Sequence, residues 1–347
     1  MRPSFHYLSA FIVAVLVSAA ATASAAQPLF DKHDTLVVSI HAPLDRISQE
    51  RESDKYHDGT LRYTDSAGAA QELDVSLRAR GRYRRQDKTC NFPPIRLNFK
   101  KKQVKESLFA GQDKLKLVTH CQNRSEYYEQ LLLKEYLAYR MLQVMTDQSF
   151  RVRLLRITWT DSEQGGEPQE QYGFLLEDEE LLGKRLGLKP AEVRSTLPNA
   201  LVADHAAMIG VYEYMIANTD FSMLLGPNDE ICCHNIVLYR SDSGHLPIPY
   251  DFDFSGFVNA PYAEPNPQLK LRSVTTRLYR GRCEHNDGLE AALQQFRDKR
   301  AELLALIEQQ PGLSDRTRKS ASGYIGDFFK IIDDPKRVRS RIVKRCV

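Results

Sequence analysis

Four side chains in the second half of the chain have the types that a phosphoryl-transfer site needs. Asp220 ends the segment YEYMIANTD and Asn235 opens NIVLYR, while Asp251 and Asp253 belong to the segment PYDFDF. An Asp can orient an attacking hydroxyl, and carboxylate and amide oxygens are the hard ligands that hold Mg²⁺ against phosphates. We predict Asp220 as the catalytic residue. The predicted metal ligands are Asn235, Asp251 and Asp253, with Mg²⁺ or Mn²⁺ as the metal.

Each of these residues also has a structural interpretation. Asp220 follows a predicted helix and can cap a turn, Asn235 can start a strand, and the Asp-Phe-Asp motif can be a solvated corner. Any one of them alone favours that interpretation. Their order along a helix end and a hairpin favours a shared site.

A cluster of basic residues in the first half could hold the phosphates. Four of the five arginines in SLRARGRYRR alternate, which predicts that Arg78, Arg80, Arg82 and Arg84 share one face of a strand. A basic sheet face opposite an acidic segment can bind a polyphosphate. The predicted cofactor-binding cations are Arg80, Arg82, Arg96, Lys114 and Lys116, and the predicted cofactor is ATP.

Other partners of this basic cluster stay open. The cluster could bind nucleic acid or another anionic surface, or it could be a solvated face. Few aromatic residues alternate with the arginines, which argues against stacking on single strands, and the formal net charge of the chain is only +3. We therefore expect a nucleotide partner and no nucleic acid. The chain has neither a P-loop nor a G-x-G-x-x-G motif.

Two glutamates complete the predicted nucleotide site. Glu135 lies on an otherwise apolar helical stripe, and a buried carboxylate needs a partner. Glu177 lies in an acidic run where the backbone could face an adenine. The candidate partners of Glu135 are Arg96, Lys114 and Lys116, or else the neighbouring Arg124 and Arg140.

The order of predicted elements indicates a β-rich first part and a helical second part. Alternating apolar residues predict strands at 35–40, 59–65, 71–85, 93–99, 113–120, 150–159 and 170–178, with one helix at 125–145 capped by Ser125. Helices follow at 178–187, 203–218, 289–310 and 320–334, with a hairpin at 235–254. We expect domains at 27–178 and 179–347, with the site at their boundary.

Residues 1–26 have the features of a cleaved signal peptide. One early Arg precedes an apolar run, and Ala23-Ser24-Ala25 fits the cleavage rule. We therefore expect an exported protein, periplasmic or extracellular, without a membrane span after cleavage near Ala25. Six cysteines in such a chain allow 15 full pairings, and among these we expect Cys90 with Cys121 and Cys283 with Cys346.

These residues, in this order, resemble a known family. RGRYRR, FPPIRLNF, KLKLVTHC, YEQLLLKEYLAYRML, IANTD, HNIVLY and IPYDFDFSG resemble the spore-coat protein H (CotH) group of atypical kinases, in particular an exported bacterial branch, over about 75–259. In that resemblance Asp220 matches the catalytic Asp, Asn235 and Asp251 match the metal ligands, and Arg96 matches the basic residue of the phosphate-binding strand. One departure is the insert FSMLLGPNDEICC between Asp220 and the His-Asn pair.

The resemblance implies an α+β, two-lobed, protein-kinase-like fold. It has a β-rich N-lobe with one main helix and an α-rich C-lobe. It also implies Mg²⁺-dependent transfer of the γ-phosphoryl of ATP to a protein Ser/Thr hydroxyl or a sugar hydroxyl. The alternative is an inactive module that binds an envelope partner or an anionic polymer. A hydrolase is disfavoured because the chain has neither a triad order nor a nucleophile-elbow pattern.

Overall fold

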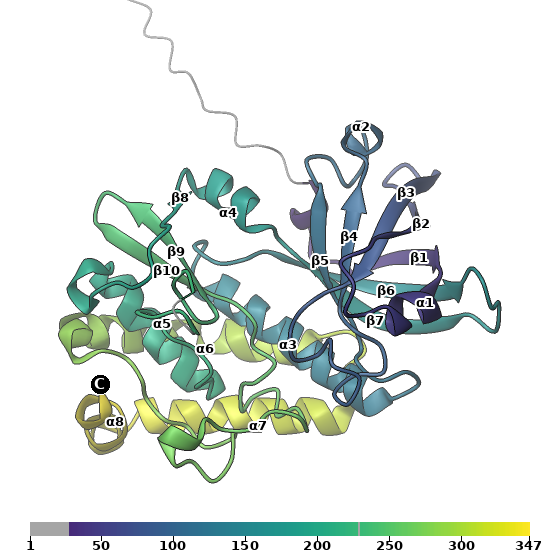
Figure 1. Ribbon diagram of the computed structural model, residues 1–347. Coiled ribbons are helices and arrows are strands. Elements are labelled where there is room, and N and C mark those ends of the chain that lie inside the picture. The colour runs from purple at the N-terminus through teal and green to yellow at the C-terminus, as the bar shows by residue number, and fades with distance from the viewer. Residues whose placement is uncertain (1–27, 228–229) are drawn as a thin grey trace, which may run out of the picture.

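A closed barrel of seven strands forms one end of the molecule in the computed structural model, which describes residues 28–227 and 230–347 (Figure 1). The predicted signal peptide lies outside the described residues. Around the barrel the strands follow the order β1-β2-β3-β4-β5-β7-β6. Their bounds are β1 (Leu36–Ala42), β2 (His57–Thr64), β3 (Ala70–Ala79), β4 (Ile95–Phe99), β5 (Lys114–Val118), β6 (Val152–Asp161) and β7 (Gln169–Leu176).

The barrel closes through its first strand. β1 pairs antiparallel with β2 and parallel with β6, where Leu36 lies opposite Leu155. All other pairs in the barrel are antiparallel. Closure leaves none of the seven strands with a free edge, which is the feature of barrels that prevents edge-to-edge association.

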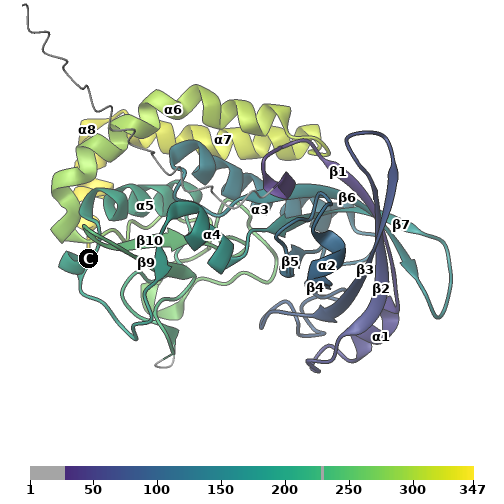
Figure 2. The same cartoon turned by 90° about the horizontal axis from the view of Figure 1, so that it is seen from above.

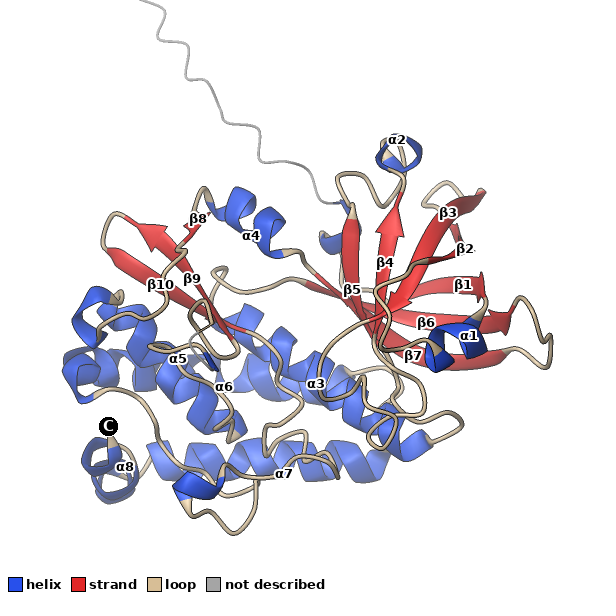
Figure 3. Ribbon diagram, in the orientation of Figure 1, coloured by secondary structure: helices blue, strands red, loops and turns tan. Residues whose placement is uncertain are grey.

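Most of the helices form the other part of the molecule, although two short ones lie on the barrel (Figure 3). Figure 2 shows α6 and α7 side by side along one side, with α8 far from the barrel. The helices of the described residues are α1 (Leu44–Gln49), α2 (Lys101–Val104), α3 (Glu126–Met145), α4 (Glu179–Leu186), α5 (Ala203–Ile216), α6 (Leu289–Gln309), α7 (Asp315–Ile332) and α8 (Pro335–Arg341). A small sheet in the order β10-β9-β8 consists of β8 (Lys189–Pro190), β9 (Ile236–Ser241) and β10 (Gly244–Pro249).

Two hydrophobic cores share strands β5, β6 and β7. Side chains alternate across a strand, so Leu155 points into the barrel core while its neighbour Leu154 packs in the helical core with α3. On β7, Leu175 likewise lies in the barrel core and Phe174 in the helical core. The barrel and the helices are therefore packed on opposite faces of the same strands.

The expected two-lobed, kinase-like α+β fold, with one main helix in its N-lobe, is wrong. The structure instead has a closed seven-stranded barrel of mixed parallel and antiparallel pairing, with α1–α8 beside it. The physical reason is the β1–β6 pairing, which joins segments far apart in the chain and leaves no mark in local periodicity. The boundary between domains near 178 stays a prediction.

Several local predictions agree with the structure. Helix α3 begins after Ser125, whose side chain accepts a hydrogen bond from the Tyr128 N–H. The disulfides Cys90–Cys121 and Cys283–Cys346 are both present. A third disulfide joins the neighbours Cys232 and Cys233. None of the helices in 28–227 and 230–347 is both long and apolar enough to cross a bilayer.

Candidate functional site

Most of the predicted site residues line one cavity between the barrel and the β9–β10 hairpin. The cavity has a volume of about 880 Å³. It brings the basic segments of β3, β4 and β5 opposite the acidic residues of the second half. The predicted residues that line it are Arg80, Arg82, Arg96, Lys116, Asp220, Asn235, Asp251 and Asp253.

Asp220 is held by the two residues that open β9. The His234 Nε2 lies 2.8 Å from one oxygen of its carboxylate, and the Asn235 amide donates to the other oxygen (3.0 Å) and to the Asp220 carbonyl (2.7 Å). A carboxylate only accepts, so the His234 Nε2 carries the proton. This hydrogen bond raises the pKa of His234 above its usual value, with partial burial opposing it. About 39% of the Asp220 side chain stays exposed.

The two ends of the insert between Asp220 and His234 lie close together. The Ser222 N–H donates to the His234 carbonyl (3.0 Å), so the two ends of the insert meet. The Cys232–Cys233 disulfide lies at its end, and Cys233 lines the cavity. The insert therefore does not separate Asp220 from Asn235.

Asp251 presents a partly free carboxylate to the cavity. Its backbone has a φ of +63°, in the left-handed region that Asp and Asn tolerate better than most residues, and Asn235 has a φ of +52°. The Asp251 N–H donates to the Tyr139 hydroxyl on α3 (2.8 Å), which fixes this turn. The carboxylate is 47% exposed, and the Arg84 guanidinium lies 3.9 Å away.

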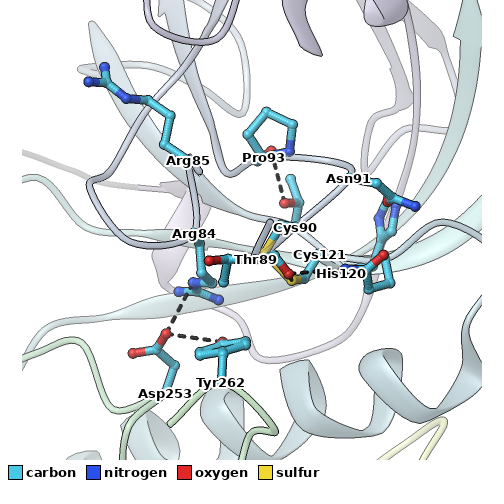
Figure 4. The surroundings of a disulfide bond; sticks show 12 residues. Arg84, Arg85, Thr89, Cys90, Asn91, Pro93, His120, Cys121, Asp253 and Tyr262 are labelled. Carbon is cyan, nitrogen blue, oxygen red and sulfur yellow. Dashed lines mark hydrogen bonds and ion pairs between the residues drawn. A yellow bond between two sulfur atoms is a disulfide. The ribbon is translucent and has the colours of Figure 1, made fainter. Parts of the chain in front are cut away.

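Arg84 lies at the centre of a buried charge cluster (Figure 4). It binds the two oxygens of Glu135 at 3.0 and 3.2 Å, and its Nε lies 3.2 Å from Asp253. Tyr262 donates to the same Asp253 oxygen (3.1 Å). Burial opposes a charged Arg84, but Glu135 and Asp253 raise its pKa well above the usual value. Burial raises the pKa of Glu135 and of Asp253, and Arg84 counters this for both.

This cluster corrects two expectations. Glu135 is buried, with 2% of its side chain exposed, but its partner is Arg84 and none of the residues that we expected. The four arginines do not share a strand face, because β3 ends at Ala79 and 80–85 form a loop. Gly81 in this loop has a φ of +88°, which a strand cannot accommodate. The loop turns Arg84 inward, whereas a continued strand would have kept it in the sheet.

A row of cations crosses the sheet beside the cavity. Arg78, Arg96 and Lys116 lie opposite one another on β3, β4 and β5. Lys116 contacts Glu179 (2.7 Å) and lies over the Tyr250 ring. The Arg96 Nε is buried and has no hydrogen-bond partner within the described part of the chain. Such an orphaned N–H is what a phosphate oxygen could satisfy.

Besides Glu135, three predicted cofactor-binding residues lie elsewhere or at the rim. Arg82 is exposed and forms a two-bond ion pair with Glu230 (2.8 and 3.0 Å). Lys114 is exposed and lines a different cavity. Glu177 is fully buried and binds Arg185 through both oxygens at 2.9 Å. Glu177 therefore fixes the chain before α4 and does not line the candidate site.

The Cys90–Cys121 disulfide and Arg51 hold the loop that carries Arg84. Arg51 donates to the Cys90 carbonyl (2.7 Å) and to the Asn91 carbonyl (3.2 Å). Figure 4 shows the disulfide beside Thr89, with Arg84 directed toward Asp253. The loop is thus fixed on the barrel side while its arginine reaches the acidic side.

Sequence reasoning missed Arg280 and Glu213, which lie behind Asp220. Arg280 donates to the Thr219 and Phe221 carbonyls (2.5 and 2.9 Å), the residues on either side of Asp220. Glu213 on α5 is 1% exposed, and burial raises its pKa to about 8, an effect that Asn218 and Arg280 reduce. No pattern pointed to Arg280. A charged residue within the apolar run of α5 was a signal for Glu213.

The donor set fits a metal ion that arrives with phosphates better than one held by the protein alone. Within 28–227 and 230–347, no three His, Cys, Asp or Glu side chains are placed to hold a metal together. Asp251 and the amide oxygen of Asn235 remain available. Mg²⁺ commonly binds through one or two protein ligands plus substrate phosphates. Asp253 instead neutralises Arg84, which weakens its case as a ligand.

Comparison of the chain with models of known protein families gave no match, and comparison with curated proteins gave none either.

Proposed function

We propose that this protein is a Mg²⁺-dependent phosphotransferase that moves the γ-phosphoryl of ATP to a protein Ser/Thr or sugar hydroxyl. The observation that carries the proposal is the convergence of Asp220, Asn235 and Asp251 with a row of cations in one cavity of about 880 Å³. Such a cavity is in the size range of small-molecule sites. The similarity to spore-coat protein H kinases in these motifs supports the same reaction, but the proposal does not depend on the fold of that family.

Each group has a role that its contacts allow. Asp220 accepts one hydrogen bond at each oxygen, so lone pairs remain to orient an acceptor hydroxyl and take its proton. Asp251 and Asn235 would hold Mg²⁺, which neutralises phosphate charge. Arg80, Arg96 and Lys116 line the wall where phosphates would lie. Arg84 acts from behind, where it compensates Glu135 and Asp253.

The competing function is an inactive module that binds an anionic polymer or an envelope partner. It is favoured by the absence of a complete metal site among the described residues. The cavity lining also holds more cations than carboxylates. Under this alternative the same cavity would bind polyanions in a salt-dependent way and would transfer no phosphoryl group.

Ligand-induced stabilisation and phosphoryl transfer test the proposal together. With ATP and Mg²⁺ at about 100 times Kd, the wild type should gain about 2.7 kcal/mol in unfolding free energy. Asp251→Ala should lose the Mg²⁺-dependent part of this gain, as well as transfer of labelled γ-phosphoryl to protein and sugar acceptors. Asp242→Ala removes an exposed carboxylate from the same hairpin and should change neither.

The outcomes separate the two functions. If no nucleotide stabilises a folded sample, the proposed phosphotransferase function is contradicted. Binding of a polyanion such as heparin that weakens with salt, and that Arg80→Ala/Arg82→Ala abolishes, would establish the binding module instead. Phosphoryl transfer that survives Asp251→Ala would show that the metal ligands are elsewhere.

We further propose that the protein acts outside the cytoplasm, in the periplasm or beyond the cell. Three disulfides support this location, because they persist in oxidising compartments. When free thiols are alkylated in rapidly quenched cells and detected by mass spectrometry, Cys90, Cys121, Cys283 and Cys346 should remain unalkylated. Free thiols at these positions in the mature protein would contradict the location.

A further inference from the structure

A second, larger cavity lies between α3, α7 and the outer face of the barrel. Its volume is about 1250 Å³, and none of the predicted site residues lines it. Val37, Arg156 and Tyr172 contribute from β1, β6 and β7, where they form a row across neighbouring strands. Figure 1 shows α3 and α7 passing beside this part of the barrel. No residue that lines this cavity also lines the candidate site.

Two cations in this cavity lack a carboxylate partner. Lys134 on α3 is half-buried and donates to the Val258 carbonyl, but within the described residues it has no ion pair. Burial lowers its pKa to about 8, so an anion beside it would be stabilising. Arg316, in the first turn of α7, is exposed and has no ion pair in the same residues. Arg156, in contrast, is engaged by Glu129 and Glu170.

Neutral hydrogen-bonding groups and an open ring surround these cations. Asn259 and Ser320 line the cavity, are exposed, and make no side-chain hydrogen bond within the described chain. The Tyr127 ring is 54% exposed. Amides and hydroxyls pair with hydroxyl groups, and the C–H face of a sugar ring packs on an aromatic ring. The lining thus offers positive charge, hydroxyl partners and a flat apolar face in one place.

We propose that this cavity binds an anionic sugar, with its carboxylate or phosphate paired to Lys134 and Arg316 and its hydroxyls bonded to Asn259 and Ser320. A neutral sugar would leave both cations without an anionic partner. A nucleic acid would need a longer row of cations than the three that line the cavity. The lining also includes two carboxylates, Glu126 and Glu129, which would repel its phosphates. The inference does not depend on the proposed phosphotransferase function.

Lys134 also connects this cavity to the candidate site. It binds the Val258 carbonyl in the loop that follows Asp253, and the next residue on α3, Glu135, binds Arg84. Gly256 and Asn259 of the same loop line the second cavity. An anion that draws the Lys134 ammonium toward itself would loosen its bond to this loop. The two cavities thus lie on either side of one short segment.

Calorimetric titration with defined sugars tests the inference. The probes are trigalacturonate, glucose 6-phosphate, neutral maltotriose and inorganic phosphate. We expect trigalacturonate or glucose 6-phosphate to bind at least tenfold more tightly than maltotriose and inorganic phosphate, and the stronger of the two identifies carboxylate or phosphate as the anion. Arg316→Ala and Asn259→Ala change exposed side chains, and each should weaken that binding at least fivefold. Lys134→Met should abolish it.

Controls keep the test independent of folding and of the first cavity. Lys319→Ala removes an exposed cation from α7 outside the cavity lining and should leave binding unchanged, as should Asp251→Ala. Should Lys134→Met fail to fold, the two exposed variants decide. The inference is overturned if no anionic sugar binds, or if either Arg316→Ala or Asn259→Ala leaves the affinity unchanged. It is also overturned if inorganic phosphate binds as tightly as the sugars, which would mean an adventitious ion only.

Discussion

Arg84 is the residue on which the buried chemistry depends most. It faces Glu135, Asp253 and, at 3.9 Å, Asp251, so one guanidinium compensates two buried carboxylates and approaches a third. Removing one partner of a buried ion pair leaves an uncompensated charge, which typically costs about 3–5 kcal/mol. Arg84 thereby occupies a position beside Asp253 that a second cation would otherwise take. The proposed metal ligands reduce to Asp251 and Asn235.

Glu213 should make stability depend on pH. Its pKa is about 8 in the folded protein against 4.5 when unperturbed, so between these values the folded state binds one more proton than the unfolded state. Stability therefore falls as pH rises through this window, by at most about 1.4 kcal/mol per pH unit. Glu213→Gln should remove this slope. Urea unfolding at pH 5, 6.5 and 8 should show that the unfolding free energy of the variant, relative to that of the wild type, increases with pH.

An exposed glutamate provides the matched control for this pH dependence. Glu192→Gln should follow the wild-type slope, because Glu192 is exposed. A Glu213→Gln variant that is less stable than the wild type by the same amount at all three pH values would show that Glu213 is ionised in the folded protein.

Residue patterns predicted local features more successfully than they predicted contacts between distant residues. Ser125 was predicted as a helix cap from its residue type, and Glu135 as a buried residue from the periodicity of α3. The grouping of Asp220, Asn235 and Asp251 in one cavity agrees with their predicted nearness, while their roles stay predictions. The pairing of Glu135 with Arg84 was not predictable, because it depends on where a loop leaves β3.

At the scale of elements, the loop 80–92 matters more than the strands around it. The loop begins where β3 ends and is held by the Cys90–Cys121 disulfide and by Arg51. The alternating arginines concealed its start, because alternation is also the mark of a strand. The sequence signal for the end of the strand was Gly81, because a glycine weakens a strand, and β3 ends just before it at Ala79.

Loss of this disulfide should affect ligand binding as well as stability. Cys90→Ala/Cys121→Ala removes a link across 31 residues, and the chain-entropy relation gives a loss of about 3–4 kcal/mol. The freed loop should also lower affinity for ATP with Mg²⁺ at least fivefold, because Arg84 loses its fixed position. Urea unfolding and titration calorimetry measure the two effects.

The C-terminal disulfide separates these two effects. Cys283→Ala/Cys346→Ala removes a link across 63 residues, neither of whose cysteines lines the cavity, and should cost about 4 kcal/mol without changing affinity. Equal affinity losses in both double variants would mean that global loosening, and not the Arg84 loop, governs binding.

At the scale of the whole molecule, the two cores are not independent. Strands β5, β6 and β7 give one face to the barrel core and the other to the helical core. Sequence alternation in β6 predicted a strand, but β6 has buried apolar side chains on both faces, such as Leu154 on one and Leu155 on the other. Such a two-sided strand is expected where it is covered on both sides. Closure through β1 and β6 could not be predicted, since it joins segments that are distant in the sequence.

Shared strands predict that the barrel and the helices unfold together. Trp159 is the one tryptophan of the chain and reports on the barrel, while far-ultraviolet circular dichroism reports mainly on the helices. The two urea transitions should coincide. Leu154→Ala, in the helical core, should cost about 2–5 kcal/mol and shift both midpoints equally. If the midpoint of the Trp159 transition does not change in Leu154→Ala, the barrel and the helices are two independent units.

The parallel pairing of β1 with β6 imposes an order on barrel assembly during synthesis. The first strand emerges early, but its partner at Leu155 emerges only after β2–β5 and α3. Contacts between distant segments form slowly, because a long loop must close before they contribute. Meanwhile the unpaired edge of β1 is open to other chains. The contact that removes the sheet edges from the finished protein is thus among the last barrel contacts that a growing chain can make.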